Sequence, residues 1–539
     1  SPTLKQEMPV IKDYTTIQGT TSHMFEVGTR KFEEKRTYYA TPSFLTVFSY
    51  PLIKGNPATA LNRIDGILIT EDMAKKYFGS DDAMGKVLRI DNGDNVVVTG
   101  ILANIPANSH LQFDFIQPMA FLAKTNDDIK KGRWDNFNFF SYVQLDKNFV
   151  ASPEAIARLN NQINQIYIKH NTEIKVKFVL QPLTDIHLRS NYQGDPPGAG
   201  NEQYVRIFFI IAFLVLITAC INFMNLATAR SARRAKEIGL RKVSGAIRGH
   251  IILQFLSESV LISFLALLLA MGLVWLFLPL FNDLAGKKIV IDYLDVKLWL
   301  GLIGIAFVTG IVSGSYPALF LSGFNPVKVL KGNMKAMGGN LIFRNMLVIT
   351  QFIVSILLLI GTFTIYNQLK FIRNRNPGFE KDNLVYIPLT GDLHNKMQAL
   401  KGELQQNRLT RNYSVVSDLP TNLMNGTISV EWTGKDPKSQ IIFPNLEIDE
   451  NFIQTFKMKM ISGRTFSKAY LADSNNYVVN EKALSVMGMN AANAVVKPLT
   501  LWGRKGMIIG VVKDFNFKPV QQAIEPLILY TSRVNGNYV

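Results

Sequence analysis

The amino-acid sequence predicts a membrane protein with α-helical transmembrane spans plus two duplicated α+β extracytoplasmic domains. Three observations predict this class: four long apolar runs, basic residues gathered between those runs, and two distant polar segments that share one pattern of landmarks. The mean hydropathy of +0.11 agrees, because soluble chains usually fall below zero. A few very apolar stretches diluted by ordinary polar sequence explain that value.

Four apolar runs are long enough to cross the hydrocarbon core of a bilayer, which takes about 20 helical residues. No charge falls between Arg206 and Arg230 or between Glu258 and Asp283. Four such runs favour membrane spans over the buried helices of a large soluble protein. The predicted spans cover about 205–228, 251–281, 298–322 and 345–369.

The net charge of +17 comes largely from two short loops between predicted spans. Residues 228–250 hold seven Arg and Lys against Glu237, and residues 322–344 hold four with no acid. This distribution argues against a nucleic-acid partner, since basic residues beside spans mark loops on the cytoplasmic side. We therefore expect both loops in the cytoplasm and the mixed-charge link 281–297 outside.

The same rule predicts the domain organisation. Residues 1–203 and 371–539 form two extracytoplasmic domains, and residues 204–370 form the transmembrane region between them. Three basic residues after the fourth span, Lys370, Arg373 and Arg375, lie on the predicted outer side. We expect that helix to continue past the bilayer as a stalk until Pro377–Gly378 ends it. The expected location is the bacterial inner membrane.

The two outer segments repeat one another at a nearly constant offset. Phe44, Phe48 and Gly55 have the same spacing as Phe452, Phe456 and Gly463. In both segments 29 residues separate a glutamate from a glycine, and these pairs are Glu71 with Gly100 and Glu481 with Gly510. Offsets of 408–410 at three landmarks indicate an internal duplication.

Local signals place helices and strands within the domains. The β-branched runs around Gly100 and Gly510 are typical of strands with a bulge. Thr70 is a candidate cap for a helix that starts at Glu71 and ends before Gly79. Ser152–Pro153 starts a helix, and residues 176–183 are predicted as a strand. We expect the sequence to be a fragment of a protein with eight spans.

The loop after the first span carries the most specific motif, "RRAKEIGLRKVSGA". It resembles the first cytoplasmic loop of the FtsX/MacB-like ABC permease family. The third span ends in "SYPALFLSGFNP", similar to the exit of that family's span, and 180–188 is similar as well. The residues that match in the first loop are Arg233, Arg234, Glu237, Ile238, Gly239, Leu240, Arg241, Lys242, Gly245 and Ala246, followed at the third span by Pro317, Asn325 and Pro326.

The resemblance implies a permease that couples to a separate cytosolic ATPase through this loop. The residue types suit the role, because Glu237 and Arg241 can pair at i,i+4. Gly239 and Gly245 allow close approach and a sharp turn. The alternative is a polybasic loop held on anionic lipid, which needs charge but no ordered Glu-Ile-Gly. The resemblance also implies partners beyond the ATPase and membrane lipid: a periplasmic adaptor or cargo, and a homo- or pseudo-dimeric permease.

Motifs of catalysis are absent from the sequence. The nearest approach to a P-loop, residues 79–87, has one residue too many and no Ser or Thr after the lysine. The six histidines are scattered, so we expect no metal site. Since no catalytic motif is present, we also expect no catalytic residue and no cofactor. Cys220 reads as a packing residue. Glu258, near the inner end of the second span, is an intramembrane polar candidate that can equally be structural.

The predicted function is an ABC transporter permease that couples ATP hydrolysis by the separate ATPase to periplasmic work by mechanotransmission. That work is efflux of an antimicrobial or peptide, or lipoprotein release, and the sequence leaves the choice open. A different class also stays open: a membrane-anchored regulator or scaffold of periplasmic cell-wall hydrolases. A signalling sensor would need an output domain outside this sequence.

Overall fold

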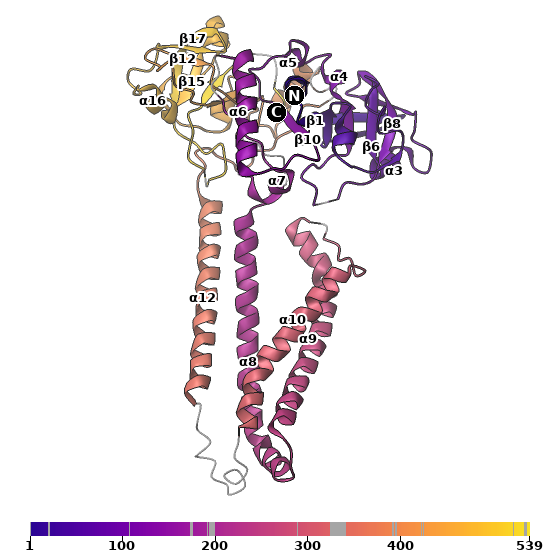
Figure 1. Ribbon diagram of the computed structural model, residues 1–539. Helices are drawn as coiled ribbons and strands as arrows, with labels where there is room; N and C mark the ends of the chain where they lie inside the picture. Colours follow the sequence, from indigo (N-terminus) through magenta and orange to yellow (C-terminus); the bar gives the residue numbers. More distant parts are fainter. Residues whose placement is uncertain are drawn as a thin grey trace. The chain divides into compact units, whose positions relative to one another are not determined.

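The chain folds into two compact units. The first unit contains Ser1–Gly200 and Arg375–Val539, and the second contains Asn201–Asn374. The computed structural model describes residues 2–19, 22–106, 108–172, 176–190, 192, 200–287, 289–323, 341–390, 393, 396–421, 423, 425–520, 522–532 and 536–539, and only the backbone at 230–236, 321 and 341 (Figure 1).

The first domain segment is built on a ten-stranded sheet in the order β10-β1-β4-β9-β6-β8-β7-β2-β3, with β5 paired to β8. Its strands are β1 (Ile11–Gly19), β2 (His23–Val27), β3 (Arg30–Glu34), β4 (Thr37–Ala40), β5 (Leu52–Lys54), β6 (Gly66–Thr70), β7 (Val87–Ile90), β8 (Asp94–Leu102), β9 (Phe115–Pro118) and β10 (Phe140–Leu145). Its helices are α1 (Pro2–Glu7), α2 (Phe44–Val47), α3 (Glu71–Phe78), α4 (Met119–Leu122), α5 (Asp127–Lys130), α6 (Pro153–His170) and α7 (Leu183–Arg189).

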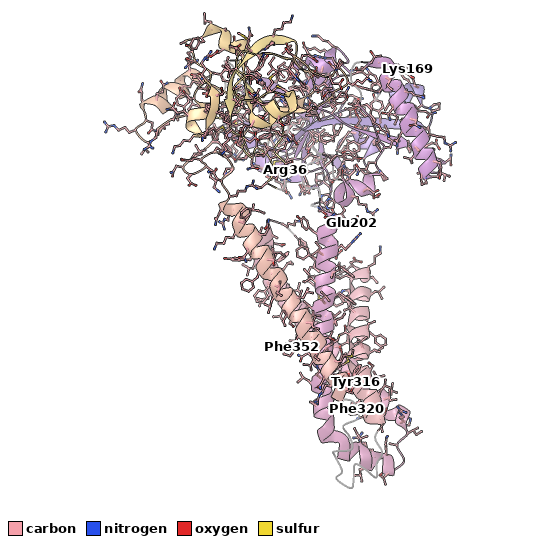
Figure 2. All side chains as sticks on the ribbon, turned by 90° about the vertical axis from the view of Figure 1, so that its left-hand side faces the viewer. Arg36, Lys169, Glu202, Tyr316, Phe320 and Phe352 are labelled. Carbon is pink, nitrogen blue, oxygen red and sulfur yellow. The ribbon has the colours of Figure 1, made fainter. Side chains whose placement is uncertain are left out.

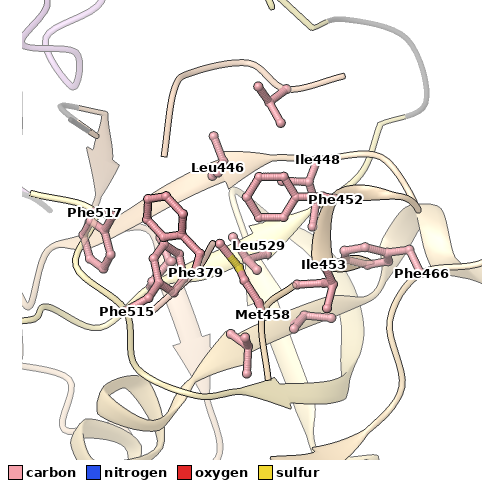
Figure 3. Close-up of a cluster of buried hydrophobic side chains, with 14 of the residues drawn as sticks. Phe379, Leu446, Ile448, Phe452, Ile453, Met458, Phe466, Phe515, Phe517 and Leu529 are labelled. Atoms are coloured by element: carbon pink, nitrogen blue, oxygen red, sulfur yellow. The ribbon is translucent and has the colours of Figure 1, made fainter. Parts of the chain in front are cut away.

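The second domain segment has an eight-stranded sheet in the order β11-β13-β18-β15-β17-β16-β12, with β14 paired to β17. Aromatic and aliphatic side chains such as Phe452, Phe515 and Leu529 fill its core (Figure 3). The elements are α14 (Met397–Gln406), β11 (Gly426–Thr427), β12 (Val430–Trp432), β13 (Phe443–Glu447), α15 (Phe452–Thr455), β14 (Met460–Gly463), η2 (Leu471–Asn475), β15 (Tyr477–Asn480), α16 (Glu481–Met487), β16 (Pro498–Leu501), β17 (Arg504–Val512) and β18 (Ile528–Tyr530).

The two sheets share one topology, which confirms the predicted duplication. In the first, β6 runs parallel to β8 and antiparallel to β9, and β9 runs parallel to β4. In the second, β15 runs parallel to β17 and antiparallel to β18, and β18 runs parallel to β13. The short helices α2 and α15, and α3 and α16, occupy the same places in chain order.

The repeated glycines lie against one another in both copies. A Cβ on Gly55 would lie 3.0 Å from Gly100 Cα, and one on Gly463 would lie 2.9 Å from Gly510 Cα. Each contact adjoins a bulge, because the register of β8 and of β17 shifts just before its glycine. The predicted bulges are therefore present, and the spacing of the landmarks reflects a steric requirement.

The short helices begin where the sequence predicted, but by different means. Helix α3 spans Glu71–Phe78 as expected, yet the Thr70 side chain makes no capping hydrogen bond. In the second copy the Asn480 side chain accepts from the Ala483 N–H at 3.0 Å. Thr70 thus occupies the predicted N-cap position, but the predicted capping by its side chain is wrong.

Residues 176–182 do not form the predicted strand. They run extended along α6, where Asn164 Oδ1 accepts from the Phe178 N–H at 2.7 Å and Asn160 Oδ1 accepts from the Leu180 N–H at 2.8 Å. These two amides of α6 take the place of a neighbouring strand. Helix α6 itself starts at Pro153 with Ser152 as its cap, as the sequence predicted.

Among the described residues of the second unit, four helices are long and apolar enough to cross a membrane. A close contact lies between α9 and α10, where a Cβ on Gly310 would lie 2.6 Å from Val260 Cα. Gly314 likewise approaches Ser259, so small residues bring the two backbones together. The helices are α8 (Glu202–Val243), α9 (Arg248–Ala285), α10 (Val296–Ser322) and α12 (Leu341–Asn374), and the last extends beyond the apolar run as predicted for a stalk.

Candidate functional site at the basic turn

The basic turn, residues Glu237–Arg248, joins α8 to α9. Helix α8 continues for 14 residues beyond its apolar part, which ends at Ala229, and stops at Val243. The Ala246 N–H donates to the Arg241 carbonyl at 3.0 Å, and the Gly245 N–H donates to the Lys242 carbonyl at 3.2 Å. With Gly245 at φ +97°, this is a Schellman ending, so the sharp turn expected at this glycine is present.

Glu237 and Arg241 pair as their spacing predicts. Arg241 Nη2 donates to Glu237 Oε1 at 2.6 Å. Since both side chains are about half exposed, the pair contributes only about 0.3–0.5 kcal/mol to stability. Arg241 Nη1 also donates to Gln254 Oε1 at 3.0 Å, which ties the end of α8 to α9. Arg241 therefore connects the turn to α9 but adds little to the stability of the fold.

A small apolar contact lies beneath these charges. Ile238 and Ile251 are 4% and 3% exposed, and Phe255 packs against them. Gly239 is buried beside Ile238. The inner side of the Glu-Ile-Gly motif is thus the base on which α8 and α9 meet.

The end of α10 joins the same turn. Lys242 Nζ donates to the Ser322 carbonyl at 2.6 Å, and Arg248 Nε donates to Ser322 Oγ at 3.2 Å. Burial, together with the nearby Arg248 guanidinium, lowers the pKa of the Lys242 ammonium. Sequence reasoning missed Ser322 and Gln254, because these contacts join residues far apart in the chain.

Apolar side chains line the outer edge of the turn. Leu240, Val243 and Ile247 are 61%, 63% and 65% exposed. Three large apolar side chains beside charged ones form a surface suited to a protein partner or a lipid interface. Sequence reasoning identified Leu240 but missed Val243 and Ile247, whose common exposure depends on how the turn folds.

The remaining predicted site residues are not brought together here. Arg233 and Arg234 lie on α8, with side chains outside the described residues, and Asn325 and Pro326 also lie outside them. Pro317 is buried within α10, and Glu258 is half-buried on α9. Among the described residues, no three His, Cys, Asp or Glu side chains are grouped to hold a metal ion.

A cavity of about 560 Å³ lies in the second domain segment between α14 and the sheet, lined by Lys401, Tyr413, Asp449 and Lys468 among others. Burial raises the pKa of the Asp449 carboxyl. This carboxyl accepts from Ser414 Oγ at 2.6 Å, the Val415 N–H at 2.8 Å and the Asn451 N–H at 3.1 Å. Thr41 takes the corresponding place in the first copy and accepts from the Thr16 N–H at 3.1 Å. Asp449 therefore stabilises the fold through these hydrogen bonds, and we assign it no role in binding.

Comparisons with known proteins agree with this architecture. The family model described as MacB-like periplasmic core domain matches residues 2–166, and the model described as FtsX-like permease C-terminal matches residues 209–326. The ABC transporter permease YknZ of Bacillus subtilis (strain 168) is 25% identical over 318 residues, 59% of this chain and 70% of that protein. The chain therefore carries a MacB-like periplasmic core domain and an FtsX-like permease domain, and it is similar to ABC transporter permeases of the FtsX/MacB type.

Two further relatives are similar over shorter stretches. The macrolide export ATP-binding/permease protein MacB of Bdellovibrio bacteriovorus is 38% identical over 121 residues, 22% of this chain and 18% of that protein. A solved permease-protein domain from Porphyromonas gingivalis is 24% identical, with a TM-score of 0.28, and the match covers 34% of this chain and 86% of that one. The chain spans less than half the length of the MacB relative from Rhodopirellula baltica, of which it covers 42%.

Proposed function

We propose that this chain is the permease part of an ABC transporter of the bacterial inner membrane, and that a separate ATPase docks on the basic turn. The observation that carries the proposal is the construction of that turn. Its base is tied to α9 and α10, while Leu240, Val243 and Ile247 remain exposed. A rigid base with exposed apolar side chains suits a surface that must bind a partner and receive force from it.

The proposed orientation places the basic turn in the cytoplasm and both domain segments outside. The support is the charge asymmetry between the ends of the helices. The turn and the start of α9 carry Arg241, Lys242 and Arg248, whereas acids and lysines are mixed around the link between α9 and α10. An ATPase in the cytosol can then reach the turn.

Mechanotransmission is the mode of action that we propose. Its support is the short anchor between α12 and the second domain segment. Helix α12 ends at Asn374, and three residues later the Pro377 carbonyl accepts from the Asn516 N–H at 2.6 Å. Phe379 follows in the domain core at 6% exposure. A link this short can pass a displacement of the helix to the domain, and the resulting work is export of an antimicrobial or peptide, or release of a lipoprotein.

A dimeric permease and a periplasmic adaptor or cargo complete the proposal. Helix α12 exposes large apolar side chains along its length, including Phe352 at 62% (Figure 2). Such a surface is suited to lipid and to the helices of a second permease half.

Substitution of Leu240 by Asp tests the docking site. We expect Leu240→Asp to abolish co-purification of the ATPase with the full-length permease, because it places a charge in the contact. Leu284→Asp, at a side chain 87% exposed near the other end of α9, is the matched control and should retain the ATPase. Retention of the ATPase by Leu240→Asp would refute the docking site. A passive scaffold would show no ATPase turnover that depends on the permease.

A flexible insertion tests the transmission step. A Gly-Ser linker placed between Arg375 and Asn376 should leave ATP hydrolysis intact and abolish transport, since the displacement of α12 would be absorbed. The same linker placed after Gly286, where α9 has ended, is the control. Full transport with the linker at Arg375 would exclude α12 as a mechanical connection.

A further inference from the structure

The last residue of α10 is held from outside its own helix. Ser322 is 1% exposed, and its carbonyl lies at a helix end where no intrahelical donor remains. Lys242 Nζ, from the end of α8, donates to this carbonyl at 2.6 Å. A cation at this position also interacts favourably with the negative end of the helix dipole.

The side chain of Ser322 makes a second connection. Arg248 Nε, from the first residue of α9, donates to Ser322 Oγ at 3.2 Å, and the hydroxyl in turn donates to the Leu319 carbonyl at 3.0 Å. One residue of α10 is thus fastened both to the end of α8 and to the start of α9. We call Lys242, Arg248 and Ser322 the Ser322 clamp.

The position of Pro317 explains why this end of α10 needs a fastening. Gly310 and Gly314 hold α10 against α9, and Pro317 follows them inside the helix. Proline lacks an N–H, so the Ser313 carbonyl loses its donor within the helix and the last turn can bend. The clamp holds the helix on the far side of that weak point.

We propose that the Ser322 clamp makes the basic turn and the end of α10 move as one body. Lys242, Arg248 and Ser322 are then positioning residues, which pass a displacement of the turn to the third predicted span. The purpose of this device rests on the proposed function, since an ATPase would supply the displacement. The clamp itself lies within the permease, so its effect on the distance between helices can be tested without the ATPase or nucleotide.

Pulsed electron paramagnetic resonance on the full-length permease in nanodiscs measures the clamp directly. Spin labels at Val243→Cys and Leu319→Cys, both exposed positions, report the distance between the end of α8 and the end of α10, which the bond from Lys242 to Ser322 holds. Cys220→Ser, with any other cysteine replaced, removes background labelling. We expect Lys242→Met to broaden the distance distribution roughly twofold, because a local fastening is lost while the fold remains.

Two further variants are expected to give intermediate or restored distance distributions. Ser322→Ala removes the bond from Arg248 but keeps the carbonyl that Lys242 contacts, so it should broaden the distribution less than Lys242→Met. Lys242→Arg keeps a cationic donor and should restore a narrow distribution. Lys297→Met, in the first turn of α10, is the control and should change nothing. A distribution equally narrow in Lys242→Met, Lys242→Gln and the unaltered protein would overturn the proposal.

Transport assays separate this inference from the docking proposal. With the ATPase bound, Ser322→Ala should reduce transport per ATP hydrolysed while the amount of co-purified ATPase stays unchanged, because Ser322 lies on α10, outside the basic turn. Loss of the ATPase from Ser322→Ala would overturn the proposal, because Ser322 would then serve docking and not transmission. Unchanged transport per ATP in a variant with a broadened distance would also refute the clamp as a transmitting device.

Discussion

The two ends of the helical unit are built differently. At the basic end, side chains cross between elements: Arg241 reaches Gln254, and Lys242 reaches Ser322. At the other end, the hydrogen bonds of the described residues in the link between α9 and α10 are local. Asn282 exchanges two hydrogen bonds with Ile289, and Trp299 Nε1 donates to the Tyr293 carbonyl.

This difference indicates which end can receive a force. A push on the basic end would move the ends of three helices together, whereas a push on the link would be absorbed within a few residues. The apolar surface alone does not distinguish the ends, since Leu284 and Leu294 of the link are also highly exposed. The distinguishing feature is the set of bonds between elements.

We expect the largest effect on stability from Gly310→Leu, because α9 and α10 contribute to both ends of the helical unit and this substitution would separate them. Gly310→Leu places a side chain against the Val260 backbone, where even a Cβ would lie 2.6 Å from Cα. We expect a loss of about 1–3 kcal/mol in unfolding free energy, because the helices must separate. Gly304→Leu is the control, since nothing lies within 4 Å of its Cβ position. Thermal unfolding in detergent measures both, and equal stability would contradict the contact.

Glu237→Lys should affect function at the basic end with little effect on stability. The exposed pair contributes little to folding, but charge reversal releases Arg241 and alters the docking surface. We expect transport per ATP to fall about tenfold, equivalent to about 1.4 kcal/mol. Asp292→Lys makes the same kind of change at the other end and should leave coupling intact. Equal loss in both variants would remove the distinction between the ends.

Gly245→Ala should strain the turn itself. Gly245 has φ +97°, which an alanine adopts at a cost of about 1 kcal/mol. Gly249→Ala, four residues on in the first turn of α9, is the matched control with open space around its Cβ. Stability of both variants can be compared by chemical denaturation. A Gly245→Ala protein as stable as Gly249→Ala would mean that the turn does not require glycine.

Asn282→Ala should have the smallest effect. It removes two exposed hydrogen bonds to Ile289, which together contribute no more than about 1 kcal/mol. Transport per ATP should be unchanged, because the link is expected only to connect two helices. A clear loss of coupling in this variant would show that force also passes through the other end.

The parts of the fold that could be predicted are those written in short-range patterns. Uninterrupted apolar runs predicted four helices, and the repeated spacing of Gly55 and Gly100 predicted the second copy around Gly463 and Gly510. The prediction of a strand at 176–183 was wrong. Its side chains do alternate between more buried and more exposed positions, but its backbone hydrogen bonds go to Asn160 and Asn164 of a helix and not to another strand.

The candidate site was predictable only in part. The pairing of Glu237 with Arg241 and the turn at Gly245 depend on neighbours in sequence, so their types and spacing predicted them. The contact of Lys242 with Ser322 joins residues 80 positions apart, and no local pattern specifies it. The exposure of Val243 and Ile247 likewise depends on how three helices meet.

Site-specific photocross-linking tests the central claim most directly. A photoreactive amino acid at Leu240 of the full-length permease, in cells that contain the ATPase, should form a covalent adduct with the ATPase. The same amino acid at Leu284 should form none, because that end is proposed to lie on the opposite side of the membrane. An ATPase adduct at Leu284, with none at Leu240, would contradict both the orientation and the role of the basic turn.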